Sequence, residues 1–231
     1  MSQTQYEKDY PFGFDCARVN GWVNWEGVAI NKPKVYFVGM RATISWGYQD
    51  DKFPENWEGA KAQNIARTAY HVFYPAQPYK PQCDNFLGVL GSDLGELPVT
   101  LDVELDHDVS PSTFRNNLLN ALRYLEDKTG RKPIIYSRAS FVNAYITGTG
   151  KTPQTWLNEY DWWLAHYGLL NSARWTLPTM PLGVEKVRLL IHQNCSIGKY
   201  DWMQSKSTDQ DYWVKGHDHF FTYSGNTPEP V

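Results

Sequence analysis

The stretch LPVTLDVELDHD, residues 97–108, places acidic side chains at every second position. Apolar side chains form one row of this pattern, and the other row holds Thr100, Asp102, Glu104 and Asp106. Alternation with a period of two predicts a β-strand with two different faces. Carboxylates at positions i and i+2 lie about 7 Å apart, so partial shielding from water pushes their pKa values apart. Such a pair can supply the acid and the base for the cleavage of one bond.

The same acidic row is also compatible with a strand that has one face in water and no chemical role. Against this, Asp and Glu are depleted in strands, and like charges on one face repel each other. The stretch alone leaves both interpretations open. The choice depends on whether other strands bring reactive groups to the same place.

Strand-like apolar runs alternate with helix-like segments along most of the chain. The clearest helix is expected over residues 110–129, where Ser110 or Ser112 can cap the start and Gly130 ends it. Repetition of strand, helix and strand predicts parallel strands joined by crossover helices. About seven such strands predict an α/β barrel, complete or irregular. A doubly wound sheet is the alternative, but no glycine-rich phosphate loop follows any strand.

In a parallel barrel, reactive groups gather at the carboxyl ends of the strands. The expected strand ends carry a set of polar and aromatic side chains, namely Asp15, Arg41, Tyr70, His71, Asp102, Glu104, Tyr136 and Tyr167. Convergence of such groups from separate strands favours a reactive pair at Asp102 and Glu104 over an exposed acidic face.

Length and composition favour a single domain, because the 231 residues contain no linker-like or charged run that would divide them. Aromatic residues make up 15% of the chain, which suits either a thick core or a cleft where rings stack on sugars. The net charge of −3 and the scattered basic residues argue against nucleic-acid binding. Cys16, Cys83 and Cys195 lack metal-site or disulfide-framework spacing, so we expect no metal and no cofactor.

An ordered set of segments resembles the lysozymes of glycoside hydrolase family 25, the muramidases of bacteria and their phages. GFDCARVNGWVNWEGV resembles the family's opening, LDVE its D-x-E strand, and HQNCSIG and STDQDYW its closing segments. The resemblance runs from Phe12 to Gly216. It implies a single-domain α/β fold, an irregular TIM-like (β/α) barrel with fewer helices than strands.

The resemblance also implies cleavage of the β-1,4 bond between N-acetylmuramic acid and N-acetylglucosamine in bacterial peptidoglycan. Glu104 would be the general acid, Asp102 would assist it, and Asp15 and Asp209 match the family's other site carboxylates. The family's closing D-x-N is D-x-D here, so Asp211 stands in the Asn position and either acid is a candidate for the role. The residues expected to bind the sugars are Arg41, Tyr70, Tyr136, Trp163, Tyr167 and Gln193.

Three alternatives stay open at this level. One is a substrate-assisted route, in which the N-acetyl oxygen is the nucleophile and Asp102 holds it. Another is a glycosidase acting on chitin-like chains, although Thr100 stands where the chitinase pattern needs an acid. The third is a non-catalytic module that binds peptidoglycan on the same barrel.

We expect residues 1–9 to form an N-terminal arm, residues 10–216 the catalytic domain, and residues 217–231 a tail or the start of a linker. The first residues lack the apolar stretch of a signal peptide, and no run of about 18 apolar residues exists. We therefore expect a soluble protein without membrane insertion that acts on the bacterial wall, as an endolysin released from a host cytoplasm does. No oligomeric state is predicted.

Overall fold

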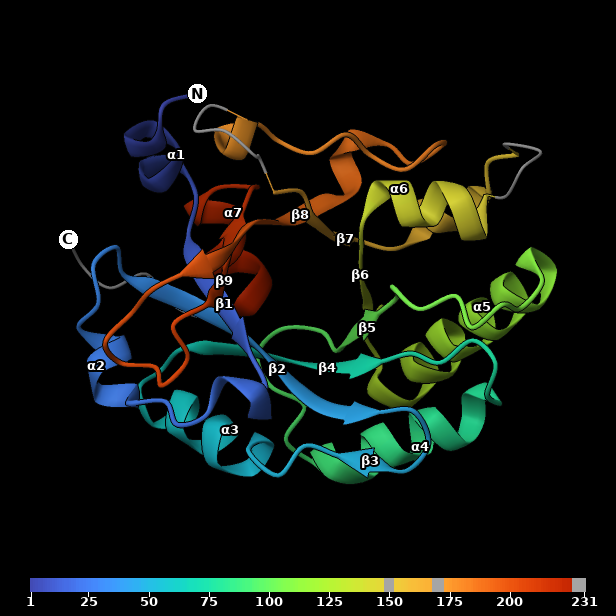
Figure 1. Ribbon diagram of the computed structural model, residues 1–231, viewed down its shortest axis with the longest axis horizontal. Coiled ribbons are helices and arrows are strands. Elements are labelled where there is room, and N and C mark those ends of the chain that lie inside the picture. Colours follow the sequence, from blue (N-terminus) through green and yellow to red (C-terminus); the bar gives the residue numbers. More distant parts are fainter. Residues whose placement is uncertain (148–151, 168–172, 226–231) are drawn as a thin grey trace.

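The computed structural model describes residues 1–147, 152–167 and 173–225. Within these ranges eight strands close into a barrel in the order β1-β9-β8-β7-β6-β5-β4-β2, with β2 pairing back to β1 (Figure 1). Their bounds are Phe12–Cys16 (β1), Val35–Ile44 (β2), Ala66–Val72 (β4), Thr100–Asp102 (β5), Ile134–Ser137 (β6), Trp162–Ala165 (β7), Leu189–Gly198 (β8) and Thr208–Trp213 (β9). The short strand β3, Tyr48–Gln49, extends the sheet beyond β2.

Strand direction decides which side chains reach one end of the barrel. Strands β1, β2 and β4 to β8 run parallel, whereas β9 is antiparallel to both of its neighbours. The carboxyl ends of the seven parallel strands therefore form one rim, and β9 reaches that rim with its amino end. This is why Asp15, near the end of β1, pairs with Asp209, near the start of β9.

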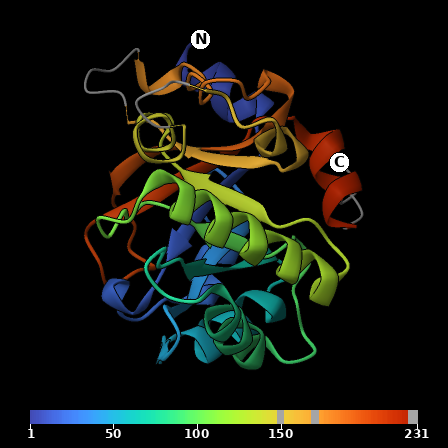
Figure 2. The same ribbon diagram turned by 90° about the vertical axis from the view of Figure 1, so that its right-hand side faces the viewer.

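The described residues include seven α-helices, fewer than the nine strands, as the sequence predicts. Their bounds are Gln3–Asp9 (α1), Trp25–Ala29 (α2), Phe53–Ala62 (α3), Tyr79–Leu90 (α4), Pro111–Thr129 (α5), Ala139–Phe141 (α6) and His217–Ser224 (α7). Helices α3, α4 and α5 cover one side of the barrel, and α5 lies beside α4 (Figures 1 and 2). None of the described helices is long and apolar enough to cross a bilayer.

Helix α5 forms where the sequence predicts it. Ser110 caps its start, with Oγ accepting from the Thr113 backbone N–H at 3.1 Å. Gly130 ends it in the left-handed conformation, with φ of 70°. Its apolar stripe is buried against the barrel, so the helix holds β5 and β6, the strands on either side of it in the chain, in place.

The acidic strand is shorter than the sequence predicts, because β5 ends at Asp102 and Glu104 lies in the irregular segment that follows. The polar side chains of β5 are also not exposed to solvent. Thr100 is fully buried, with its hydroxyl 3.0 Å from that of Thr68, and Asp102 is 7% exposed. Since β4 and β6 flank β5 and the barrel is closed, this row faces the interior.

The first and the last helix of the described residues pack against the barrel. Tyr6 of α1 is buried, and its hydroxyl lies 2.6 Å from His192 Nδ1 in β8. The segment expected to be a tail begins with α7, whose buried Phe220 packs on Phe37 and Trp213 at the end opposite the carboxyl rim. Residues 226–231 lie outside the described part of the chain.

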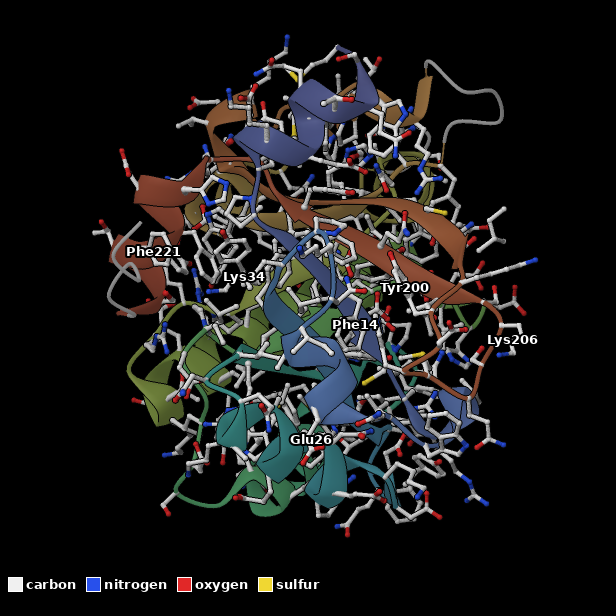
Figure 3. The ribbon with its side chains drawn as sticks, turned by 90° about the vertical axis from the view of Figure 1, so that its left-hand side faces the viewer. Phe14, Glu26, Lys34, Tyr200, Lys206 and Phe221 are labelled. Carbon is white, nitrogen blue, oxygen red and sulfur yellow. The ribbon has the colours of Figure 1, made fainter. Side chains whose placement is uncertain are left out.

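The long loop between β8 and β9 is held against β1 by contacts between aromatic rings. The ring centroid of Trp202 lies 4.8 Å from that of Phe14 and 4.5 Å from that of Tyr200. Phe14 and Tyr200 are labelled on the face shown in Figure 3. The loop delivers the chain to Thr208, where β9 begins. This packing therefore fixes where Asp209 enters the rim.

Candidate active site

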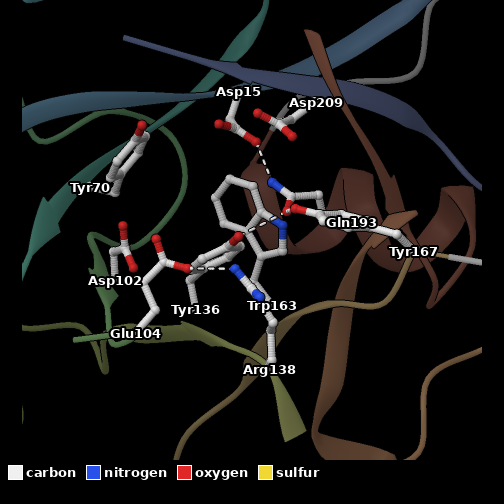
Figure 4. Close-up of a pocket in the computed structure, with 10 residues that line it drawn as sticks. All are labelled: Asp15, Tyr70, Asp102, Glu104, Tyr136, Arg138, Trp163, Tyr167, Gln193 and Asp209. Atoms are coloured by element: carbon white, nitrogen blue, oxygen red, sulfur yellow. Dashed lines mark hydrogen bonds and ion pairs between the residues drawn. The ribbon is translucent and has the colours of Figure 1, made fainter. Parts of the chain in front are cut away.

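Ten side chains line one cavity of about 220 Å³ at the carboxyl rim (Figure 4). They are Asp15, Tyr70, Asp102, Glu104, Tyr136, Arg138, Trp163, Tyr167, Gln193 and Asp209. Nine of the ten are residues named from the sequence as site candidates, and they come from seven different strands or the segments just after them. The barrel thus gathers side chains that are far apart in the chain, while their individual roles remain predictions.

Of the residues expected to bind the sugars, Arg41 does not line this cavity. Its Nε donates to Oδ2 of Asp50 at 2.8 Å, and the Asp50 side chain is fully buried. The pairing of β2 with β4 is irregular just after Arg41, where bulges commonly redirect a side chain. Asp50 is therefore its ion-pair partner, and Arg41 acts on the cavity through its charge, which favours ionisation of Asp102.

Arg138, directly after β6, lines the cavity but was not expected from the sequence. Its Nη2 lies 3.4 Å from Oε2 of Glu104. The only available signal was its position at the end of the strand IIYS, beside the acidic row. Such a position predicts a location at the rim but not the acid that it contacts.

A second cavity of about 250 Å³ adjoins the first and is lined by Glu104, Arg138, Ser140, Phe141 and Tyr145. The rings of Phe141 and Tyr145 lie 4.6 Å apart, and Tyr145 is 39% exposed. Glu104 and Arg138 line both cavities, so this ion pair stands between them.

Asp102 is the buried member of the acidic pair. Burial raises the pKa of its carboxyl well above the ordinary value, and the charges of Glu104 and Asp15 raise it further. Its Oδ1 is buried and has no hydrogen-bond partner among the described residues. Glu104 is one-third exposed and ion-paired. The two carboxyls therefore stand in different environments, the arrangement that separates the acid from the base in a pair.

On the opposite wall, Gln193 holds Asp15. The Gln193 amide donates from Nε2 to Oδ2 of Asp15 at 2.6 Å, and its Oε1 accepts from the hydroxyls of Tyr136 and Tyr167. Burial raises the pKa of Asp15 well above the ordinary value, and the charge of Asp209 raises it further. Hydrogen bonds from Asp211 and Gln193 act in the opposite direction.

Asp209 faces Asp15 across the β1–β9 pair. Burial, and then the charge of Glu104, raises its pKa to about 6. The cavity thus brings together carboxyls whose pKa values are raised and the ion pair of Glu104 with Arg138, and hydrolysis of a glycosidic bond needs two carboxyl groups in different roles. Among the described residues no group of three or more His, Cys, Asp or Glu side chains is arranged to hold a metal ion.

The sequence profile of the glycosyl hydrolases of family 25 matches residues 14–180, a span that contains Asp15, Asp102 and Glu104. The chain belongs to glycosyl hydrolase family 25. Family membership agrees with the irregular barrel, and it makes the rim cavity the place to look for glycoside hydrolysis.

Three known proteins show how far the likeness extends. Among relatives by sequence, the uncharacterized protein YegX of Escherichia coli O6:H1 is 33% identical over 158 residues, 67% of this chain and 56% of YegX. Lysozyme M1 of Streptomyces globisporus is 28% identical over 181 residues, 74% of this chain and 58% of that protein. The chain therefore spans little more than half the length of these relatives.

Among solved structures, the bacterial lysozyme of Streptomyces coelicolor superimposes with a TM-score of 0.77 at 23% identity. The match covers 94% of this chain and 98% of that chain. At 23% identity this similarity establishes the fold alone. Any statement about the reaction depends on the residues of the site.

Proposed function

We propose that this family 25 chain is a peptidoglycan hydrolase that cleaves the β-1,4 bond between N-acetylmuramic acid and N-acetylglucosamine. Its partner is then bacterial peptidoglycan, and its place of action is the bacterial wall. Family membership and the similarity to lysozyme M1 support a lysozyme-type activity. The acid-lined cavity at the rim supports the chemistry.

Glu104 is the proposed general acid, and one observation carries this assignment: it is the one carboxyl that lines both described cavities. A group that protonates a glycosidic oxygen has to stand between the two sugars that the bond joins. The first cavity would hold the sugar whose anomeric carbon reacts. The second, with Phe141 and Tyr145, would hold the leaving sugar, because aromatic rings stack on pyranose faces.

Asp102 is proposed to assist from inside the first cavity. A buried carboxyl with an unpaired oxygen is suited to orient the N-acetyl group of the reacting sugar. In the substrate-assisted form of this route, the N-acetyl oxygen attacks the anomeric carbon while Glu104 protonates the leaving oxygen. Trapping a covalent sugar adduct on Asp102 or Asp209 with a fluorinated substrate would contradict that form.

A specific observation favours a second assignment within the same function. Burial raises the pKa of Asp102, so its surroundings favour the protonated form, whereas Glu104 is ion-paired with Arg138. In this alternative Asp102 protonates the leaving group, and Glu104 stabilises the positive charge that develops on the sugar in the transition state.

Leaving-group dependence separates the two assignments. Loss of a general acid costs about 10²- to 10⁴-fold on a poor leaving group but little on a nitrophenol, which needs no protonation. We expect Glu104→Gln to follow this pattern, with activity largely kept on a nitrophenyl glycoside, and Asp102→Asn to lose activity on both substrates. The reverse result would assign the acid to Asp102.

The function itself is tested by the clearing of bacterial walls by wild type and Glu104→Gln, with mass analysis of the fragments. Clearing by the wild type alone, with new reducing ends on muramic acid, is the expected result. Release of chitin-type fragments with N-acetylglucosamine ends would favour the chitin-like alternative. Tight binding of walls from several bacteria without fragments would favour a binding module.

A further inference from the structure

Asp211 is a fully buried carboxyl that lies behind the cavity rather than in its lining. In the β1–β9 ladder it pairs with Gly13, and Asp209 pairs with Asp15. Alternate residues of a strand share a face, so Asp211 is the diagonal neighbour of Asp15. The two side chains are close enough for a hydrogen bond that lowers the pKa of Asp15 and raises that of Asp211.

Two carboxyl groups can share a hydrogen bond only when one of them carries a proton. The remaining partners indicate which one it is. Asp15 already accepts a hydrogen bond from Gln193, whose amide orientation is fixed because its oxygen accepts from two tyrosine hydroxyls. Asp211 accepts the Trp163 indole N–H on Oδ1 at 2.8 Å, and its buried Oδ2 has no donor among the described residues. Oδ2 of Asp211 is therefore the atom that needs a proton.

We propose that Asp211 is protonated in the working enzyme and donates from Oδ2 to Asp15, which makes it a positioning residue that keeps Asp15 an ionised acceptor. A protonated Asp211 thus offers Asp15 a hydrogen-bond donor, as the side-chain amide of an asparagine at this position would. It also links Asp15 to Trp163, which lines the cavity. The consequence for sugar cleavage rests on the proposed muramidase function, whereas the protonation of Asp211 does not.

The electrostatic surroundings agree with this assignment. Burial raises the pKa of Asp211 well above the ordinary value, and the charges of Asp15 and Asp209 raise it further, while the Trp163 hydrogen bond acts in the opposite direction. The largest charge contributions to the pKa values of the pair come from β1, β9 and the segment after β5, namely from Asp15, Asp209 and Glu104. The hydroxyls of Tyr70, Tyr136 and Tyr167 also interact with these carboxyls. The largest charge contributions to both pKa shifts come from carboxylates, so keeping one proton lowers the electrostatic repulsion in the pair.

Two substitutions of similar size test the positioning role. Asp211→Asn keeps a donor toward Asp15, and we expect kcat/KM on bacterial walls to stay within about threefold of the wild type. Asp211→Leu removes the donor, and we expect a loss of about 100-fold at an unchanged helical circular dichroism spectrum. A loss in Asp211→Asn as large as in Asp211→Leu would overturn the proposal, since it would mean that the charge of Asp211 is what the enzyme uses.

A spectroscopic measurement tests the proton directly and does not depend on activity. The infrared difference spectrum of wild type minus Asp211→Asn at pH 7 is expected to contain the C=O band of a protonated carboxyl. A difference spectrum with only carboxylate bands would overturn the proposal even if the variant is active. If the wild type cleaves no wall, the proposed function fails, and the infrared result still decides whether Asp211 carries a proton.

Discussion

Gln193 and Asp15 are joined by a hydrogen bond in which the Gln193 side-chain amide donates from Nε2 to Oδ2 across 2.6 Å. The bond is buried and joins two strands that are not neighbours in the barrel, because β9 lies between β1 and β8. Two tyrosine hydroxyls hold the other end of the amide. The donor to Asp15 thus depends on a network of neutral groups rather than on a basic residue.

Replacing this amide by a carboxylate should disable the site. In Gln193→Glu the donor becomes an acceptor, so a second negative charge faces Asp15 in a buried place, and we expect kcat/KM to fall by about 100-fold. Wall-clearing kinetics at pH 7 measure this loss. Gln63→Glu adds the same charge after the end of α3, outside the cavity lining, and serves as the control. Equal activities of the two variants would show that the Gln193 donor is not needed.

Asp209 should make the protein less stable as pH rises. Its folded-state pKa of about 6 lies above the ordinary value of 3.8, so the folded protein binds this proton more tightly than the unfolded chain does. The resulting loss of unfolding free energy begins near pH 4 and is complete above pH 6, and it amounts to up to about 3 kcal/mol. Asp209→Asn removes this loss, so its stability should exceed that of the wild type at pH 7.

Urea unfolding of the wild type and of Asp209→Asn at pH 3.5 and pH 7 measures this effect. At pH 3.5 the side chain at position 209 is neutral in both folded proteins, so the acidic sample is an internal control in which the two proteins should differ little. A stability difference that is the same at both pH values would show that Asp209 keeps an ordinary pKa in the folded protein.

Gly39 is required because β2 passes directly behind the indole of Trp163. A Cβ atom at position 39 would lie 2.4 Å from Cη2 of Trp163, so Gly39→Ala has to displace a side chain that lines the cavity. We expect a loss of about 1–3 kcal/mol in unfolding free energy, the usual cost of overpacking, together with reduced activity. Gly47→Ala is the matched control, because a Cβ there meets no atom within 4 Å.

Urea unfolding and near-ultraviolet circular dichroism of the two alanine variants test this prediction. The dichroism should change in Gly39→Ala, because the environment of Trp163 changes, and should stay the same in Gly47→Ala. Matching stability and spectra for both variants would mean that the indole moves aside without cost.

Arg67 is a structural residue outside the candidate site. It is 1% exposed, pairs with Asp93 at 3.0 Å and Glu96 at 2.8 Å, and lies 4.3 Å above the ring of Trp57. Arg67→Met removes one partner of buried ion pairs, and we expect a loss of about 3 kcal/mol, the lower end of the range because both carboxylates are partly exposed.

Urea unfolding measures this loss, and activity per folded molecule should be unchanged. Lys61→Met is the control, since Lys61 pairs with the same Asp93 from an exposed position. A stability loss in the control equal to that of Arg67→Met would show that the burial of Arg67 adds nothing to its contribution.

The sequence predicts the elements whose signals are local. Helix α5 follows from an apolar stripe with a serine cap and a glycine stop, all within a short segment. It does not predict where β5 ends, because the apolar alternation continues to Leu105 while strand pairing stops at Asp102. Whether a residue belongs to a strand depends on partners from β4 and β6, which no local pattern contains.

The candidate site residues also fall into those that the sequence identifies and those that depend on the fold. The acids Asp102 and Glu104 stand out by type and spacing alone, so the sequence by itself determined that a carboxylate pair is present and which family the chain resembles. Only the tertiary structure decided that Arg41 pairs with Asp50, that Arg138 reaches Glu104 and that Asp211 lies against Asp15. The physical reason is that burial and hydrogen-bond partners depend on which strands the closed barrel brings together. Gln193 and Asp15, for example, are 178 residues apart along the chain and 2.6 Å apart in space.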